Sequence, residues 1–116
     1  MMLSHQSDAD IMAIANPIMD NLMAGSTAID HAQHTRDFSE RMKAIVTPEH
    51  LHYVCQHYQA VWGYFTGREL VAVFRRPASV AIVWKQFCSQ QAGEFVAEIV
   101  LIEQNGQYLV DHAMVF

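Results

Sequence analysis

The sequence contains little charge, and its positive charges are dispersed. Asp and Glu number 12 against 7 Lys and Arg, and the formal net charge is −5. The most basic stretch, residues 36–43, is interrupted by Asp37 and Glu40. Nucleic-acid binding needs a basic surface that displaces counterions from phosphates, and anionic membranes attract basic amphipathic segments. Because no such stretch is present, we expect neither nucleic acid nor a membrane among the partners.

Cysteine is also scarce, and no motif of cofactor chemistry accompanies it. Cys55 and Cys88 have no CxxC or Cys/His spacing that would indicate a zinc or redox site. His31 and His34 are three residues apart but have no third ligand nearby in the sequence. Phosphate-binding loops, dinucleotide fingerprints and nucleophilic-serine motifs are missing as well. We therefore expect no metal and no cofactor.

Long apolar runs are the third absence. No stretch reaches the roughly eighteen consecutive apolar residues that suggest a membrane-spanning helix. The first ten residues, MMLSHQSDAD, lack the basic and apolar regions of a secretory signal. These two absences predict a cytoplasmic protein.

Apolar side chains, by contrast, are abundant for a chain of this size. Hydrophobic residues make up 52% of the 116 residues and charged residues 16%. The length suits one domain, which we expect over residues 1–116 with residues 1–6 disordered. Because a small domain has little interior, the apolar surplus should line a cavity or be covered by a second subunit.

Residues 7–63 have helical periodicity with clear start signals. Ser7 and Asp10 have the spacing of a capping box, Pro17 predicts a kink or a later start, and Gly25 with Ser26 predicts the end of this first helix. Two short helical pieces should follow, and a longer helix should then run to Gly63. The expected N-caps of these three helices are Asp30, Ser39 and Thr47, the last followed by Pro48 and Glu49.

From about residue 68 the apolar period changes to two, which predicts four strands at 68–76, 79–89, 94–103 and 107–116. Asn105-Gly106 is a strong hairpin signal because a type I′ turn needs positive φ at both central residues. Short connections make neighbouring strands antiparallel. Helices followed by strands predict an α+β fold, with N-terminal helices packed on a four-stranded antiparallel sheet.

The turn lengths also predict a register. A two-residue turn at 105–106 places Ile99 opposite His112, and a four-residue loop at 90–93 places Lys85 opposite Glu98. Alternation then assigns one set of strand residues to the helix-facing side and another to the outer side. The helix-facing set includes Trp84, Gln86, Cys88 and His112; the outer set includes Lys85, Phe87, Glu98, Val100 and Asp111.

Three segments followed by this meander resemble a nuclear-transport-factor-2-like (cystatin-like) domain: Arg36–Lys43, Thr47–Glu49 and Trp62-Gly63. More narrowly, the chain is similar to small bacterial and archaeal families of unknown function in that superfamily. The resemblance implies a curved sheet wrapped around a long helix, a conical pocket between them and dimerisation through the outer sheet face. The superfamily contains isomerases, dehydratases, cyclases, adaptors and ligand binders, so the fold does not select an activity.

We expect a pocket of apolar and aromatic side chains with a few polar groups, the usual form of a small-molecule site. His112 is the candidate general base because its ordinary pKa suits neutral pH. A lone titratable group without an orienting partner is more often a core histidine, however. The expected pocket residues are Tyr58, Trp62, Trp84, Gln86, Cys88 and His112.

The outer set of strand residues is the expected dimer interface: Lys85, Phe87, Glu98, Val100 and Asp111. Within this set, Lys85, Glu98 and Asp111 should form a diagonal line of charges across three strands, which we interpret as an ion-paired patch and not as an acid–base pair.

Three functional hypotheses follow. The first is an uncharacterised homodimer whose apolar pocket binds a small hydrophobic molecule, without catalysis. The second is an isomerase, dehydratase or cyclase that uses His112, and the third is a protein-interaction module whose outer sheet face docks a different partner.

Overall fold

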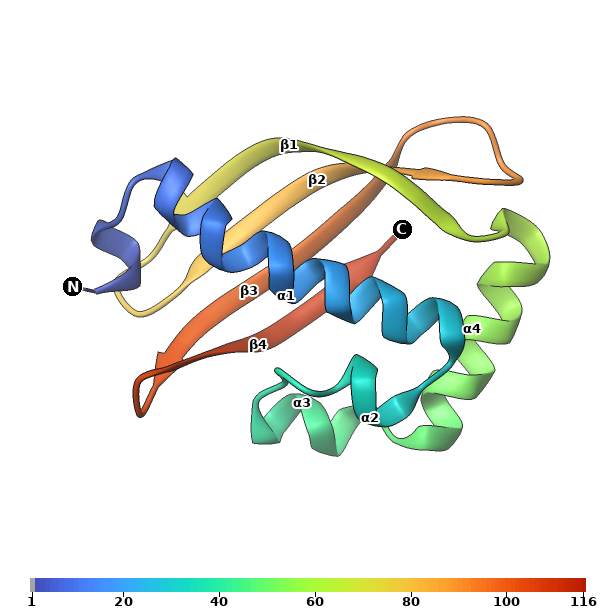
Figure 1. Cartoon of the computed structure of the whole chain (residues 1–116), viewed down its shortest axis with the longest axis horizontal. Helices are drawn as coiled ribbons and strands as arrows, with labels where there is room; N and C mark the ends of the chain where they lie inside the picture. The colour runs from blue at the N-terminus through green and yellow to red at the C-terminus, as the bar shows by residue number, and fades with distance from the viewer. Residues whose placement is uncertain (1) are drawn as a thin grey trace.

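The computed structural model describes residues 2–116 and places all helices before the sheet (Figure 1). The predicted α+β class is confirmed. The helical elements are η1 (Leu3–His5), α1 (Asp8–Ala28), α2 (His31–His34), α3 (Glu40–Ile45) and α4 (Pro48–Trp62). The strands are β1 (Phe65–Arg75), β2 (Val80–Cys88), β3 (Phe95–Gln104) and β4 (Gln107–Val115).

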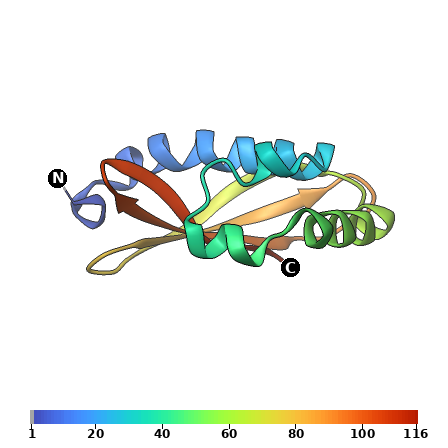
Figure 2. The same ribbon diagram turned by 90° about the horizontal axis from the view of Figure 1, so that it is seen from below.

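The four strands form one open antiparallel sheet in the order β1-β2-β3-β4, as the short connections predict. Helix α1 lies along one face of this curved sheet, α4 lies beyond one of its ends, and α2 and α3 lie beside the β4 edge (Figures 1 and 2). The opposite face, here called the outer face, carries part-exposed side chains such as Val83 and Val100.

Local capping signals locate the helix starts correctly. Side-chain oxygens of Ser7, Asp30, Ser39 and Thr47 each accept a hydrogen bond from the backbone N–H three residues later, at 3.1 to 3.3 Å. Each bond satisfies one of the N–H groups that a helix start leaves unpaired. Gly63, with φ +76°, ends α4 as predicted.

Helix α1 is longer than its sequence signals predict. It begins after Ser7, continues through Pro17, and ends at Ala28, where Ile29 adopts a left-handed φ of 52°. Gly25 lies inside the helix, and a side chain is excluded there because a Cβ would be 2.5 Å from the backbone N of His34. The glycine therefore permits the close approach of α2, and interpreting it as a stop signal was wrong.

The core lies between α1 and the inner face of the sheet. Every second residue is buried from Val80 to Gln86 in β2 and from Ala97 to Leu101 in β3, as predicted. The apolar ones among them pack on the α1 stripe that includes Ile11, Ala15 and Met19. Leu3 of η1 belongs to the same cluster and is 5% exposed. Residues 1–6 were expected to be disordered; here Leu3–His5 form η1, and Met1 lies outside the described residues.

The register of β4 agrees with the prediction only next to its turn. Gln104 pairs with Gln107 and Leu101 with Val110, but Val100 then pairs with His112, which leaves Asp111 as an extra residue. A β-bulge of this kind reverses the alternation beyond it. Ser39 Oγ donates to Asp111 Oδ1 at 2.8 Å, and Ser39 N donates to Val110 O at 2.9 Å, so contacts from the α3 start hold the bulge.

The register of β2 against β3 differs from the prediction by two residues. Lys85 pairs with Val96, and Glu98 pairs with Val83. The chain leaves β2 earlier than expected because Ser89 N donates to Tyr64 O at 2.8 Å and Gln90 N donates to Trp62 O at 2.9 Å. A shift of two residues preserves the face of each side chain, so the core prediction for these strands is confirmed.

Candidate functional site

A cavity of about 430 Å³ lies among α1, α2, α4 and the ends of β1 and β4. Its walls are largely aliphatic and aromatic, and no Asp, Glu, Lys or Arg lines it. The lining residues are Met19, Leu22, Met23, Ser26, His34, Val46, His50, Leu51, Val54, Cys55, Tyr58, Trp62, Phe65, Ala113, Met114 and Val115.

Aromatic side chains from α4 form one wall of the cavity. Tyr58 stacks on Phe65 with 4.6 Å between ring centroids and an interplanar angle of 16°. Trp62 packs against Phe95 at 4.7 Å. Aromatic pairs in such offset geometries stabilise by about 0.5–1.5 kcal/mol beyond their buried area. This wall is therefore held in place by contacts with the sheet.

A small group of polar atoms interrupts the apolar lining between α1 and α4. Ser26 Oγ lies 2.7 Å from the Tyr58 hydroxyl and 3.4 Å from Cys55 Sγ. Gln59 Nε2 donates to the Tyr58 hydroxyl at 3.3 Å. Burial raises the pKa of Tyr58, so the phenol stays protonated at neutral pH. The group is thus a neutral hydroxyl cluster.

His34 is the second polar feature of the lining. Its Nδ1 lies 2.8 Å from the Leu22 carbonyl oxygen, and its ring meets Phe38 edge-on at 5.3 Å. Burial is the main cause that lowers the pKa of His34, and nearby His31 lowers it further, against the hydrogen bond to Leu22. His34 is therefore neutral at physiological pH.

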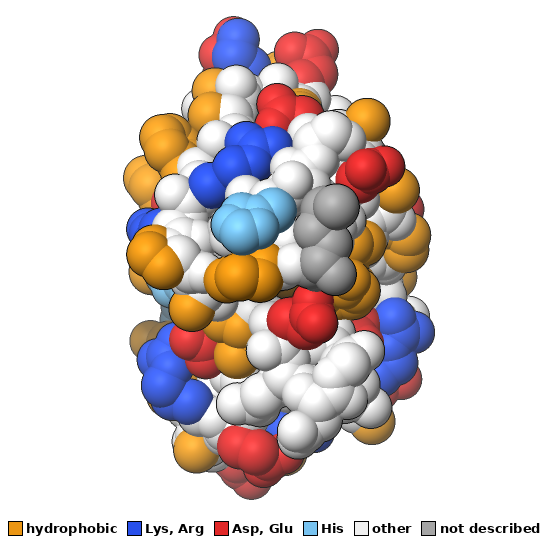
Figure 3. Space-filling view, turned by 90° about the vertical axis from the view of Figure 1, so that its left-hand side faces the viewer, with side chains coloured by type: hydrophobic (Ala, Val, Ile, Leu, Met, Phe, Trp, Pro, Cys, Tyr) orange, Lys and Arg blue, Asp and Glu red, His pale blue; other side chains and the backbone are white. Residues whose placement is uncertain are grey.

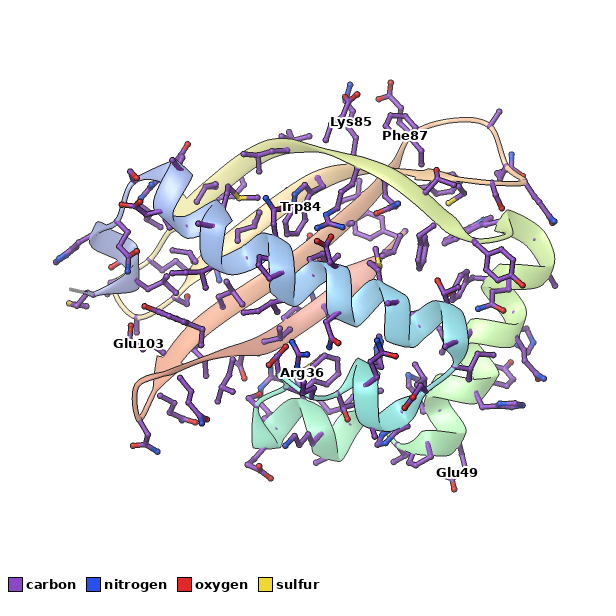
Figure 4. All side chains as sticks on the ribbon, in the orientation of Figure 1. Arg36, Glu49, Trp84, Lys85, Phe87 and Glu103 are labelled. Carbon is purple, nitrogen blue, oxygen red and sulfur yellow. The ribbon has the colours of Figure 1, made fainter. Side chains whose placement is uncertain are left out.

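Two of the predicted pocket residues, Tyr58 and Trp62, line this cavity. Trp84 lies elsewhere, under α1 (Figure 4). The Arg68 guanidinium carbon lies 5.3 Å from the centroid of the Trp84 ring. Both residues border a separate hollow between α1 and β1. Gln86 is buried and donates through Nε2 to the carbonyls of Gly67 and Phe87. The cavity thus lies toward the other end of α1 from Trp84.

His112 does not reach the cavity, and its assignment to the inner face was wrong. The bulge at Asp111 turns it to the outer face, where His112 Nε2 lies 2.9 Å from Glu98 Oε1. Cys88 does not line the cavity either, and burial raises the pKa of its thiol, which disfavours the reactive thiolate. The hypothesis of a His112 base in the pocket therefore has no geometric support.

The diagonal line of charges on the outer face is also not formed. Lys85 Nζ is 3.2 Å from Glu94, Glu98 pairs with His112, and Asp111 accepts from Ser39 and Arg41. Lys85 and Phe87 extend from β2 away from α1 (Figure 4). At the N-terminal end of the molecule, charges of both signs are interspersed with apolar side chains (Figure 3).

Sequence reasoning missed Ser26 and His34. The Gly25-Ser26 pair has the composition of a helix end, and His34 stands three residues from His31 with no third ligand nearby in the sequence. Only the packing of α2 on α1 brings both side chains to the cavity. Among residues 2–116, no three His, Cys, Asp or Glu side chains are close enough to hold a metal ion. Within the same range, every helix is too short or too polar to cross a membrane.

The helices followed by the curved antiparallel meander define the fold as nuclear-transport-factor-2-like, or cystatin-like. A nuclear-transport-factor-2-like protein of unknown function from Shewanella baltica has a TM-score of 0.58 and 8% identity over 97% of each chain. A cystatin-like protein of unknown function from Methylobium petroleophilum has a TM-score of 0.52 and 16% identity over 90% of this chain and 75% of that one.

A third solved structure is a Thiobacillus denitrificans protein named for the association domain of calcium/calmodulin-dependent protein kinase type II. It has a TM-score of 0.61 and 10% identity over 86% of this chain and 91% of that one. No family model and no curated protein matches the sequence. At these identities the likeness establishes the fold alone.

Proposed function

We propose that this chain is a homodimeric, non-catalytic domain that holds a small hydrophobic molecule in the cavity beside α4. The single observation behind the proposal is an aliphatic and aromatic hollow of about 430 Å³ whose lining contains no Asp, Glu, Lys or Arg. Sites for small molecules commonly measure about 300–1,000 Å³ and combine an apolar lining with a few polar groups. Ser26, His34 and Tyr58 supply those polar groups.

Dimerisation through the outer face is the second half of the proposal. Phe87, Val100 and other part-exposed apolar side chains lie on this face, around the His112–Glu98 pair. Covering such a patch with a second copy would remove apolar area from water, at roughly 25 cal/mol per Å². Lys85 and Glu98 would lie within this interface. The two free cysteines, Cys55 and Cys88, are compatible with the cytoplasmic location that we also propose.

The test of ligand binding uses N-phenyl-1-naphthylamine, a neutral probe whose fluorescence rises in apolar surroundings. We predict that Ala113→Phe lowers probe affinity at least about tenfold, because its ring fills the cavity from β4 and displaces apolar contact worth more than about 1.4 kcal/mol. Ala60→Phe is the matched control, since Ala60 is exposed on α4 outside the lining. Equal probe affinity in both variants would count against this cavity as the binding site.

Native mass spectrometry of the purified protein is the complementary measurement. Two chains with a small, removable adduct would support both halves of the proposal. A bare monomer at all concentrations would contradict dimerisation and favour a different protein partner for the outer face.

A further inference from the structure

We propose that the ligand of this cavity is a neutral, largely apolar molecule whose one polar group donates a hydrogen bond, such as a phenol or an alcohol, and that Nε2 of His34 accepts that bond. The inference deepens the proposed function and rests on it. It follows from the tautomer of His34, from the hydrogens of the Ser26 cluster and from the absence of charge in the lining.

The tautomer of His34 is determined by its contact with α1. Gly25 allows the His34 backbone to approach α1 closely, which places the ring over the last turns of that helix. His34 Nδ1 is 2.8 Å from the Leu22 carbonyl oxygen, and a carbonyl oxygen can only accept. Nδ1 therefore carries the hydrogen, and in a neutral ring Nε2 carries a lone pair.

Nε2 of His34 is free to accept a bond from a ligand. Within residues 2–116 no hydrogen bond to this nitrogen is formed. It is also not one of the unpaired side-chain atoms sealed from solvent, which are Arg68 Nε and Gln86 Oε1. His34 lines the cavity, and we infer that Nε2 faces a molecule bound there.

The hydroxyl cluster also presents acceptors. If the Tyr58 hydroxyl donates to Ser26 Oγ at 2.7 Å, the Ser26 hydroxyl can donate to Cys55 Sγ at 3.4 Å, so both hydroxyl hydrogens have partners within the protein. Gln59 Nε2 uses one lone pair of the Tyr58 hydroxyl, and the lone pairs of Ser26 Oγ and of Tyr58 that remain can only accept. Both polar features of the wall thus match a hydrogen-bond donor.

The polar group of the ligand should be uncharged. No Asp, Glu, Lys or Arg lines the cavity, and His34 is kept neutral chiefly by burial. The remaining titratable side chains of the lining are His50, which is exposed, Cys55 and Tyr58. An ionised group placed here would lose its hydration without a counter-charge, at a cost of several kcal/mol.

The test compares 4-butylphenol, 4-butylanisole and 4-butylbenzoate at pH 7.5 by isothermal titration calorimetry. The three probes share an aromatic ring and an alkyl chain. The phenol hydroxyl can donate a hydrogen bond, the anisole ether oxygen can only accept one, and the benzoate carries a negative charge. We expect the phenol to bind about 3–10-fold more tightly than the anisole, the value of one neutral hydrogen bond. The benzoate should bind most weakly.

His34→Asn is the diagnostic variant because an Asn side-chain amide can replace Nδ1–H as donor to Leu22 O but has no counterpart of Nε2. It should abolish the preference for phenol over anisole. His57→Gln, at an exposed position of α4 outside the lining, should keep the preference.

Equal binding of phenol and anisole to the unaltered protein would overturn the inference and leave the proposed function standing. Tightest binding of the benzoate, or an unchanged preference in His34→Asn, would overturn it as well. Failure of all three probes to bind, with no response of N-phenyl-1-naphthylamine to Ala113→Phe, would overturn the proposed function and this inference together.

Discussion

Individual side chains in this chain owe their properties to contacts that are remote in sequence. His34 has the surroundings of a neutral core imidazole because its ring is packed between α1 and Phe38, with Nδ1 bonded to Leu22 O. His112, the candidate base from the sequence, instead pairs with Glu98 on the outer face at 2.9 Å. His112 is thus absent from the pocket position that strand alternation predicts, while His34, which the sequence does not place there, lines the cavity.

At the residue scale we predict that the free energy of unfolding decreases as pH falls below about 6.5, and that protonation of His34 causes part of this decrease. The unfolded chain protonates this residue near its ordinary pKa of 6.5, whereas burial lowers the pKa in the folded state. The unfolded state therefore binds more protons, and the contribution present above pH 6.5 is lost as pH falls through the lowered folded value. Urea unfolding at pH 7.5 and pH 5 should show a larger loss for the unaltered protein than for His34→Asn. Equal losses would contradict the prediction.

At the scale of elements, the contacts between helices and strands decide features that local patterns predict wrongly. Helix α1 continues through Gly25, whose missing side chain lets α2 pack close to α1. The extra residue Asp111 fits into β4 because Ser39 and Arg41 bind its carboxylate. The first contact builds one wall of the cavity. The second turns Ala113 and Val115 toward the cavity and His112 away from it.

We predict that Gly25→Ala destabilises the protein by about 1–3 kcal/mol, the usual cost of overpacking a close contact. A helical Gly→Ala change ordinarily stabilises a protein by about 0.5–1 kcal/mol. A destabilising effect at Gly25 would therefore indicate the steric clash. The reason is that the new Cβ would lie 2.5 Å from His34 N and 2.6 Å from His34 Cα, which are backbone atoms. Urea denaturation measures the difference. Gly67→Ala, with no atom within 4 Å of its new Cβ, is the control and should cost nothing.

At the scale of the whole molecule, one core cluster joins helices and sheet, while the outer face of the sheet keeps part-exposed apolar side chains. A chain with 52% hydrophobic residues fills that core and still has apolar side chains left for the cavity and this face. Our proposal assigns the cavity to a ligand and the outer face to a second copy.

We predict that Val100→Glu converts a dimer into a monomer, because it places a carboxylate next to Glu98 and opposite His112 within the proposed interface. Light scattering across a range of concentrations should show a mass of two chains for the unaltered protein and one for the variant. Val61→Glu, on the exposed side of α4 at 62% exposure, should remain a dimer. A persistent Val100→Glu dimer would mean that the subunits meet elsewhere.

Signals that act within a few residues were sufficient to determine the order of elements, the four helix caps, the Asn105-Gly106 turn and the buried faces of β2 and β3. These features depend on local hydrogen bonds and on burial periodicity, which adjacent residues define by themselves. The bulge at Asp111, the role of Gly25, the two-residue shift of β2 on β3 and the cavity position of His34 were decided by the tertiary structure. Each depends on atoms that the chain brings together over long sequence distances, such as Ser39 with Asp111, and local propensity contains no term for such contacts.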